Sequence, residues 1–448
     1  MAQGLDRFFL RYHSHFGSRT RSCGTVSRAY LAGLFQAEKR NMERIAEVVP
    51  ATDDQALQHF LSYSPWSHRE VMDHVALDVS ERFAGSPNTC LILDESAFPK
   101  KGRASAGVAR QWCGRLGKVE NCQVGVFAAL ASEGQVALTD ARLYLPEAWV
   151  NDPARCKRAK IPEEERQYRS KAQLALEMVR HARRVGVSFA WVGADSFYGA
   201  DGAFLRALEA DGEVFVVDVK ASQRIYLEDP RPRVPPRRSR RGRAPKRPKA
   251  QGPDSVRVDA WVREQPEESW TRLTYRDSTK GPLTVEVLHR RVWLWDKREP
   301  RAHCWHLVVR RSVRAPQEIK YTLTNAPADT PLERLVYMQG QRYWVEHSLQ
   351  EAKSEVGMDQ YQVRLWQGWH HHMAMVMMAL LFMLEVRQAH RSELPLLSAN
   401  DIRQVLAVLL PRANVTFEDI CAQLVKRHQK RAAAIAWFHR KSNQYSEL

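Results

Sequence analysis

Hydrophobic residues recur at intervals of three and four through the N-terminal part of the chain, which is typical of amphipathic helices. The spacing is clear at 30–49 and 69–83, and turn-forming residues separate these stretches at 62–68. The pattern therefore predicts an all-helical domain over residues 1–88.

From Cys90 onward the apolar residues form short runs instead. TCLILDES, NCQVGVFAALAS and QVALTDARLYL are three such runs, and they predict an antiparallel meander. A helix over 163–186, an apolar run that stops at Asp195, a helix near 202–211 and the strand EVFVVDVK follow. A meander of three strands and then helix, strand, helix, strand is the order of an RNase H-like core. We therefore expect an α/β fold whose catalytic core begins with residues 89–220.

The alternation of strands and helices stops after Lys220. The tract 231–249 holds ten basic residues interspersed with proline and cannot bury apolar surface, so we expect an extended, mobile loop. Strand-like segments follow it, which predicts a β-rich insertion over 221–328. Helices resume at 329–390 as the second part of the core, and a basic helical region closes the chain at 391–448.

Charge points to a polyanionic partner. The formal net charge is +17, and the chain outside the ten basic residues of the tract still carries +7. A basic excess that extends beyond one tract favours nucleic acid, although an ordinary cationic protein fits the same balance. The seven cysteines are scattered and form no close C-x-x-C pair, and the N-terminus lacks the apolar stretch of a signal peptide. The longest apolar run, 373–384, is too short to span a bilayer, so we expect a cytoplasmic protein with no membrane partner.

Acidic residues stand where two of the apolar strands end. Asp94 and Asp195 occupy these positions, and Glu346 lies on a helix after the insertion, seven residues before Lys353 on the same helix face. A carboxylate at the rim of a core is costly unless something compensates its charge. Carboxylates from three segments can hold two divalent cations for phosphodiester chemistry, and Mg²⁺ suits hard oxygen ligands. The alternative for each acid is a turn or solvated residue, and Glu351 and Glu355 compete for the third position from another face of the helix.

Other polar and aromatic groups have both a functional and a structural interpretation. Lys100 and Lys101 could contact DNA phosphates or solvate a loop. The run 370–372 of three histidines suggests a metal cluster, but adjacent helical residues cannot all face one ion, so we expect them not to be ligands. The arginines of the basic tract are candidates for DNA contact, whose strength would fall with salt: Arg237, Arg238, Arg240 and Arg241.

Three stretches of the chain are similar to the DDE transposases of the insertion sequence 701 family, which is related to the larger insertion sequence 4 group. They are LDESAFPKKGRASAGVARQWCGRLGKVENCQVGV, WVGADSFYG and RYWVEHSLQEAKSEVGMDQYQVRLWQGWHHHM. In the wider group the third acid lies in a Y-(2)-R-(3)-E-(6)-K signature, and Arg342, Glu346 and Lys353 match its last three positions. Gln339 stands at the tyrosine position, and the first block reads Asp-Glu-Ser from Asp94 where relatives have Asp-Asp-Thr.

The resemblance implies cut-and-paste transposition of the chain's own insertion sequence. Asp94, Asp195 and Glu346 would be the catalytic, metal-binding residues, holding two Mg²⁺ ions, for which Mn²⁺ could substitute. Arg342 and Lys353 would lie beside the scissile phosphate. The enzyme would act as a homodimer on terminal inverted repeats and target DNA in the bacterial cytoplasm, associated with the nucleoid, and pass through hairpin ends.

The resemblance also implies DNA contacts outside the core. The helical N-terminal domain would bind DNA, and the insertion would contact it near the cleavage site. Tryptophans of the insertion, Trp293, Trp295 and Trp305, could stack on an unpaired base or simply pack within strands.

Two other functions are compatible with parts of this pattern. One is a catalytically silent or domesticated DNA-binding protein derived from a transposase, which the complete set of three acids argues against. The other is a different nuclease of the same fold, which would not need both a helical N-terminal domain and a long β-rich insertion.

Overall fold

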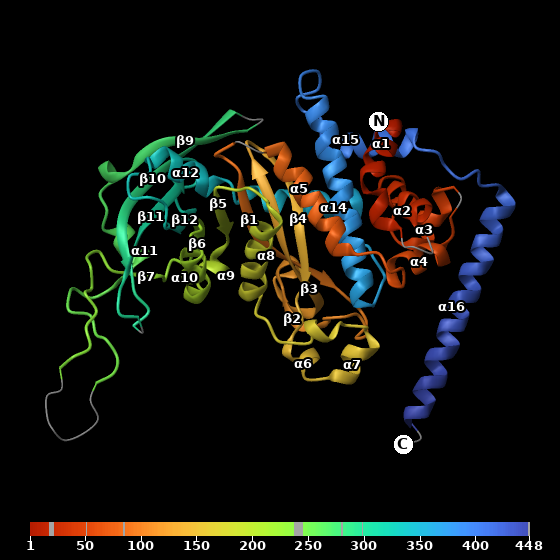
Figure 1. Cartoon of the computed structure of the whole chain (residues 1–448), viewed down its shortest axis with the longest axis horizontal. Helices are drawn as coiled ribbons and strands as arrows, with labels where there is room; N and C mark the ends of the chain where they lie inside the picture. Colours follow the sequence, from red (N-terminus) through yellow and green to blue (C-terminus); the bar gives the residue numbers. More distant parts are fainter. Residues whose placement is uncertain are drawn as a thin grey trace.

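A long twisted sheet runs through the molecule, with the N-terminal helices at one end and the insertion at the other (Figure 1). The structure, a computed structural model, describes residues 1–17, 22–50, 52–83, 86–236, 245–278, 281–297 and 299–446. The fold is mixed α/β, and its central strands have the order expected of an RNase H-like core.

The N-terminal region is helical, as predicted. Its elements are α1 (Ala2–Tyr12), η1 (His13–Phe16), α2 (Gly24–Gln36), α3 (Met42–Val48), α4 (Asp54–Ser62) and α5 (His68–Phe83). The periodic stretch 30–49 is divided between two helices because the Asn41 side chain accepts the N–H of Arg44 and starts α3. These helices share one hydrophobic core with the rest of the protein, since Phe8 and Phe35 pack against Phe382. The boundary of an N-terminal domain therefore stays a prediction.

The core strands follow the predicted order. They are β1 (Cys90–Pro99), β3 (Lys118–Ser132), β4 (Gln135–Leu143), β5 (Trp191–Ala194) and β6 (Phe215–Val219). β3 pairs antiparallel with both β1 and β4, which confirms the meander, and β5 and β6 extend the sheet parallel to β1. The sequence interpretation missed β2 (Ala109–Cys113), a short exposed strand that pairs with β3 after a turn at η2 (Gly114–Leu116).

Short and long helices connect these strands. They are α6 (Glu147–Val150), α7 (Pro153–Arg158), η3 (Glu163–Glu165), α8 (Lys171–Val185), α9 (Ser196–Gly199) and α10 (Gly202–Ala210). The helix predicted over 163–186 begins later, because Ser170 and Gln173 form a capping box and the preceding acids make a separate turn. It ends as predicted at Gly186, whose φ of 94° is left-handed.

Four strands of the insertion belong to the core sheet, and two strands in its first part form a small sheet of their own. It contains β7 (Arg224–Ile225), β8 (Val256–Arg257), α11 (Val258–Arg263), η4 (Glu267–Ser269), β9 (Thr271–Ser278), β10 (Gly281–Leu294), β11 (His303–Ser312) and β12 (Ile319–Thr324). β12 pairs antiparallel with β6, so the last four strands continue the core sheet in the order β6-β12-β11-β10-β9. The described strands thus join insertion and core into one ten-stranded sheet.

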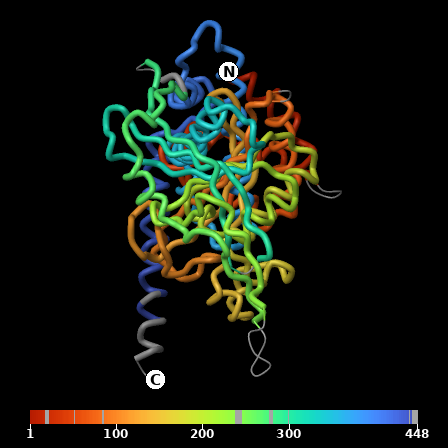
Figure 2. The backbone as a smooth tube through the Cα atoms, turned by 90° about the vertical axis from the view of Figure 1, so that its left-hand side faces the viewer, coloured from red at the N-terminus to blue at the C-terminus, as the bar shows by residue number. Residues whose placement is uncertain are grey.

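The C-terminal part is helical. It consists of α12 (Leu332–Gly340), α13 (Tyr343–Val356), α14 (Trp366–Ala389), α15 (Ala399–Leu409) and α16 (Phe417–Ser446). Among the described residues α14 is the one helix long and apolar enough to cross a membrane, but 78% of its most apolar window is buried inside the protein. α16 and the segments that flank the basic tract extend away from the body (Figures 1 and 2).

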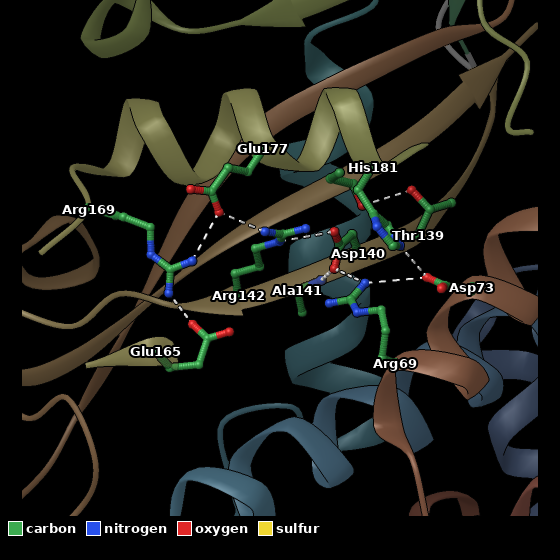
Figure 3. A network of polar contacts seen from close by, with 11 residues as sticks. Arg69, Asp73, Thr139, Asp140, Ala141, Arg142, Glu165, Arg169, Glu177 and His181 are labelled. Atoms are coloured by element: carbon green, nitrogen blue, oxygen red, sulfur yellow. Dashed lines mark hydrogen bonds and ion pairs between the residues drawn. The ribbon is translucent and has the colours of Figure 1, made fainter. Parts of the chain in front are cut away.

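A buried ion-pair network ties the N-terminal helices to the core (Figure 3). Asp140 of β4 lies 2.8 Å from the Arg69 guanidinium of α5 and 3.4 Å from that of Arg142. Arg142 reaches Glu177 of α8 at 3.0 Å, and His181 of α8 reaches Asp73 of α5 at 2.7 Å. Helices from two regions of the chain are therefore fixed on the same strand.

Candidate active site

Asp94 and Asp195 occupy equivalent positions on adjacent parallel strands. Leu93 of β1 is paired with Ala194 of β5, so the acid that follows each residue lies at the same level of the sheet. Neighbouring strands lie about 4.8 Å apart, which brings the two carboxylates together at the edge where β5 ends. The expectation that Asp94 ends its own strand is wrong, because β1 continues past it to Pro99 and stays paired with β3. Oδ1 of Asp94 accepts the N–H of Glu95 at 2.7 Å, and Oδ1 of Asp195 accepts that of Phe197 at 2.9 Å.

Glu346 approaches this edge from α13, which packs against β1, β3 and β4. Burial is the main cause that raises the pKa of Asp94 to about 7. The negative charges of Asp195 and Glu346 raise it further, while the Glu95 amide and the Arg342 guanidinium oppose the rise. Asp195 and Glu346 are therefore close enough to Asp94 to act on its carboxyl group.

The second acid of the first block faces away from this group. Glu95 accepts a 2.7 Å hydrogen bond from Lys171 at the start of α8, and the Tyr198 hydroxyl lies 3.5 Å from its other oxygen. Successive side chains of a strand point to opposite faces, so Glu95 lies on the α8 face while Asp94 lies on the α13 face. Its charge is compensated by Lys171.

Two basic residues border the acids: Arg342, just before α13, and Lys353, in its last turn. Arg342 donates to Asp218 at 2.9 Å and to Glu346 at 2.6 Å. Lys353 lies two turns beyond Glu346, half-buried; burial lowers its pKa, Arg115 lowers it further, and Asp359 and Asp94 oppose this. The two cations thus lie within electrostatic reach of Asp94, and their contact with a phosphate stays a prediction.

The donor set suits a hard divalent cation. Each of the strand carboxylates is fixed through one oxygen to the backbone, and oxygen ligands are those Mg²⁺ prefers. Within the part of the chain that the structure describes, no three His, Cys, Asp or Glu side chains are grouped as a metal site. Glu346 is paired with Arg342, so it would have to exchange this partner for a metal ion.

Comparison with known proteins agrees with this geometry. Residues 11–282 match the family described as DDE superfamily endonuclease, more than half of the chain. The chain belongs to this family. It is also 23% identical over 360 residues to the probable transposase for insertion sequence element IS701 of Microchaete diplosiphon, covering 80% of this chain and 81% of that protein. The prediction of a DDE endonuclease related to that transposase is confirmed.

The family match includes the positions of Asp94 and Asp195 but ends before Glu346. The assignment of these three acids as catalytic ligands in this DDE endonuclease therefore stays a prediction. Their convergence at one edge of the sheet is what the structure adds to it.

The predicted DNA-contacting residues differ in how far they are exposed to solvent. Lys101 is exposed, whereas Lys100 is half-buried with its ammonium 3.5 Å from the Tyr361 ring centre, and burial lowers its pKa to about 8. Trp305 is 4% exposed and donates to Glu209 at 2.8 Å, which favours the strand-packing interpretation over base stacking. Trp293 and Trp295 are half-buried. The predicted tract arginines lie outside the described residues: Arg237, Arg238, Arg240 and Arg241.

The histidine run is buried in α14, where its rings contact other groups of the protein; that these histidines are not ligands stays a prediction. His371 lies 2.9 Å from the carbonyl oxygens of both Leu61 and Trp66, and His372 lies 2.8 Å from the Tyr30 hydroxyl. These histidines hold α14 against the N-terminal helices.

Sequence reasoning missed two features beside the acids. Asp218 stands inside the apolar strand FVVDV and gave no signal as a site residue. The β2–β3 hairpin exposes Trp112 by 56% and Val119 opposite it by 51%, next to the exposed Arg110 and Arg115. Alternating basic and apolar residues in ARQWCGRLGKV could have indicated this surface.

Proposed function

We propose that this DDE endonuclease is the transposase of its own insertion sequence and moves it by cut-and-paste. The observation that carries the proposal is the convergence of Asp94, Asp195 and Glu346 at one edge of the sheet, with Arg342 and Lys353 beside them. The similarity to the probable IS701 transposase supports the same activity.

In the proposed reaction the three carboxylates hold the metal and the two cations hold the DNA. Two Mg²⁺ ions, or Mn²⁺ in their place, would activate the attacking water or 3′-OH and stabilise the leaving oxygen. Asp94 and Asp195 are oriented by backbone amides before any ligand arrives. Arg342 and Lys353 offset the negative charge that develops on the scissile phosphate.

The proposed DNA substrate is double-stranded, with terminal inverted repeats first and target DNA afterwards. We assign DNA contacts outside the core to the N-terminal helices, the basic tract and the β2–β3 hairpin. The tract is rich in arginine and lysine, and the hairpin exposes Trp112. Pairing of two ends calls for a homodimer, and hairpin ends are the expected intermediate. The enzyme would act in the bacterial cytoplasm on the nucleoid.

The test is cleavage of DNA that carries the ends flanking the gene, with Mg²⁺ or with a chelator. We expect metal-dependent cuts at the element boundary that Asp94→Asn abolishes. Glu95→Gln is the matched control, because the neighbouring carboxylate pairs with Lys171 on the opposite face and its loss should leave cleavage within a few-fold. Sequence-specific binding without cutting under any divalent metal would instead identify a catalytically silent DNA-binding relative.

A further inference from the structure

Asp218 lies beside the predicted acids but uses both of its oxygen atoms within the protein. Ala194 of β5 pairs with Val217 of β6, so Asp218 stands level with Asp195 on the next strand. Its Oδ1 accepts a 2.8 Å hydrogen bond from the Thr322 hydroxyl, and its Oδ2 accepts one of 2.9 Å from Nε of Arg342. The two oxygens of Asp218 thus hold two side chains of the protein, Thr322 and Arg342.

Arg342 is held at two points of its guanidinium group. Nε donates to Asp218, and one terminal nitrogen lies 2.6 Å from Glu346. The guanidinium is planar and its donors have a fixed geometry, so anchoring Nε determines where the terminal nitrogens point. The side chains of Arg342 and Asp218 are 21% and 18% exposed, whereas that of Glu346 is 51% exposed. Asp218 is therefore the buried anchor of Arg342, and Glu346 is its more exposed partner.

Thr322 and Gln339 hold Asp218 through two further hydrogen bonds. The Gln339 side chain is buried and its Nε2 donates to the Thr322 hydroxyl at 2.7 Å. Since the hydroxyl has one proton and gives it to Asp218, it must accept from Gln339, and the direction of every bond in the chain is set. Turning the amide over would bring its oxygen against a hydroxyl that has no proton left to give. The sequence of contacts is Gln339, Thr322, Asp218, Arg342 and Glu346.

We propose that Asp218 is a positioning residue that keeps Arg342 in place when Glu346 leaves it for a metal ion. The inference rests on the proposed function for the exchange at Glu346, but not for the anchoring itself. With Asp218 present, Arg342 keeps a carboxylate partner on β6 and stays at the edge where the scissile phosphate would lie. Without it, Glu346 is the remaining carboxylate within ion-pair distance of Arg342 among the described residues, so the cation competes with the metal.

Gln339 has a defined place in this arrangement. It stands at the position where the related signature has tyrosine, and it supports Asp218 through Thr322 instead of facing the DNA. Strand β12, which carries Thr322, belongs to the insertion, so the insertion contributes through Asp218 to the position of the Arg342 side chain.

The anchoring is tested first without DNA or metal. In protein labelled with ¹⁵N at arginine Nε, the Arg342 signal is assigned by its absence in Arg342→Lys. We expect this N–H to be protected from solvent exchange in the wild type and to lose protection in Asp218→Asn. Asp259→Asn is the control, because Asp259 accepts a hydrogen bond from Nε of another arginine, Arg257, in the insertion. An unchanged Arg342 signal in Asp218→Asn would overturn the proposal whatever the protein does to DNA.

The role in the reaction is tested by a double-mutant cycle on strand cleavage. We expect Asp218→Asn to lower the cleavage rate at saturating DNA by about 10- to 100-fold and to raise the Mg²⁺ concentration needed for half-maximal rate. In an Arg342→Gln background the same change should add nothing, because Asp218 acts through Arg342. Additive losses in the cycle would mean that Asp218 merely supports the sheet. An inactive wild type would refute the proposed function alone, since the exchange measurement still decides the anchoring.

Discussion

The Gln339 side chain has about as little contact with solvent as a core leucine, although it occupies a signature position just before α13, the helix that carries Glu346. It is 4% exposed and donates to Thr322 at 2.7 Å. A polar side chain buried to this extent needs a hydrogen-bond partner, and here the partner is Thr322. The chemistry of this position is therefore that of an internal support.

Restoring the signature tyrosine at position 339 should harm the protein. Gln339→Tyr inserts a larger side chain into a filled site and removes the donor to Thr322, so we expect a loss of about 1–3 kcal/mol in the free energy of unfolding. Urea unfolding of both proteins measures it. A variant of unchanged stability that bound DNA more tightly would show that this position faces the substrate.

The acids could be predicted from the sequence around each residue. Asp218 and Gln339, whose hydrogen bonds hold the side chain next to them, could not. Asp94 and Asp195 each end an apolar run, a signal that a sequence carries locally. Asp218 depends on the pairing of β6 with β12, which brings Thr322 from 104 residues away. Gln339 could be recognised as a departure from a signature, but its burial depends on how α12 packs. Contacts of this kind follow from the tertiary fold and leave no local pattern.

Among the elements, the β2–β3 hairpin presents an exposed apolar surface with cations around it. Trp112 and Val119 face each other across the two strands, and the turn between them is linked to the segment after α13 by the Arg115–Asp359 ion pair. Such a surface suits the stacking of a base beside a charged backbone. The sequence interpretation assigned no element to β2, because five residues of half-exposed strand carry little periodicity.

Removing the indole of Trp112 should weaken DNA binding. We expect Trp112→Ala to lose about 1–3 kcal/mol of binding free energy, more on ends with unpaired bases than on fully paired DNA, because a tryptophan stacks on an open base. Fluorescence anisotropy with the two DNA forms measures the difference. Leu396→Ala, which removes a side chain that is 78% exposed between α14 and α15, provides the control. Equal affinity for the wild type and Trp112→Ala would exclude the hairpin from the interface.

The ion-pair network around Asp140 makes stability depend on acid. Burial by itself raises the pKa of Asp140, but Arg69 and Arg142 outweigh it and lower the pKa to about 2. A lowered carboxyl pKa gives stability that is complete above the unfolded value of 3.8 and is lost as pH falls toward about 2. We expect Asp140→Asn to cost about 2–3 kcal/mol at pH 7, since it removes the buried charge that Arg69 and Arg142 share, while each keeps one other carboxylate partner. In urea unfolding, the gap between wild type and variant should narrow below pH 4. A constant gap would contradict this account.

At the scale of the whole molecule, α16 is attached by surface charges rather than by a core. Lys430 lies 2.6 Å from Asp54 and 3.0 Å from Glu43, and Lys426 lies 3.1 Å from Asp54. Phe417 on the same helix is 74% exposed. Exposed ion pairs contribute about 0–1 kcal/mol each, so the helix is the most weakly held of the long elements.

Salt should release α16. At about 1 M salt the screening length falls to about 3 Å, so we expect the amides of α16 to exchange with deuterium faster than at 0.1 M. Asp54→Asn should have the same effect at low salt, because Asp54 forms ion pairs with both Lys426 and Lys430. The buried amides of α14 serve as the internal reference. Equal exchange of α16 in all three samples would show that contacts other than these charges hold it.

The continuity of the sheet limits how this enzyme could be re-engineered. Residues 321–324 of β12 cover the outer edge of β6, so joining residue 220 to 329 would uncover a row of unpaired backbone amides and carbonyls. Bare edges of this kind recruit other chains, and such a shortened protein would aggregate. It would also lack Thr322, leaving Asp218 without one of its two partners. A chimaera that carries a relative's insertion must therefore match the register between β6 and β12. The insertion cannot be exchanged as an independent domain, because its strands continue the core sheet.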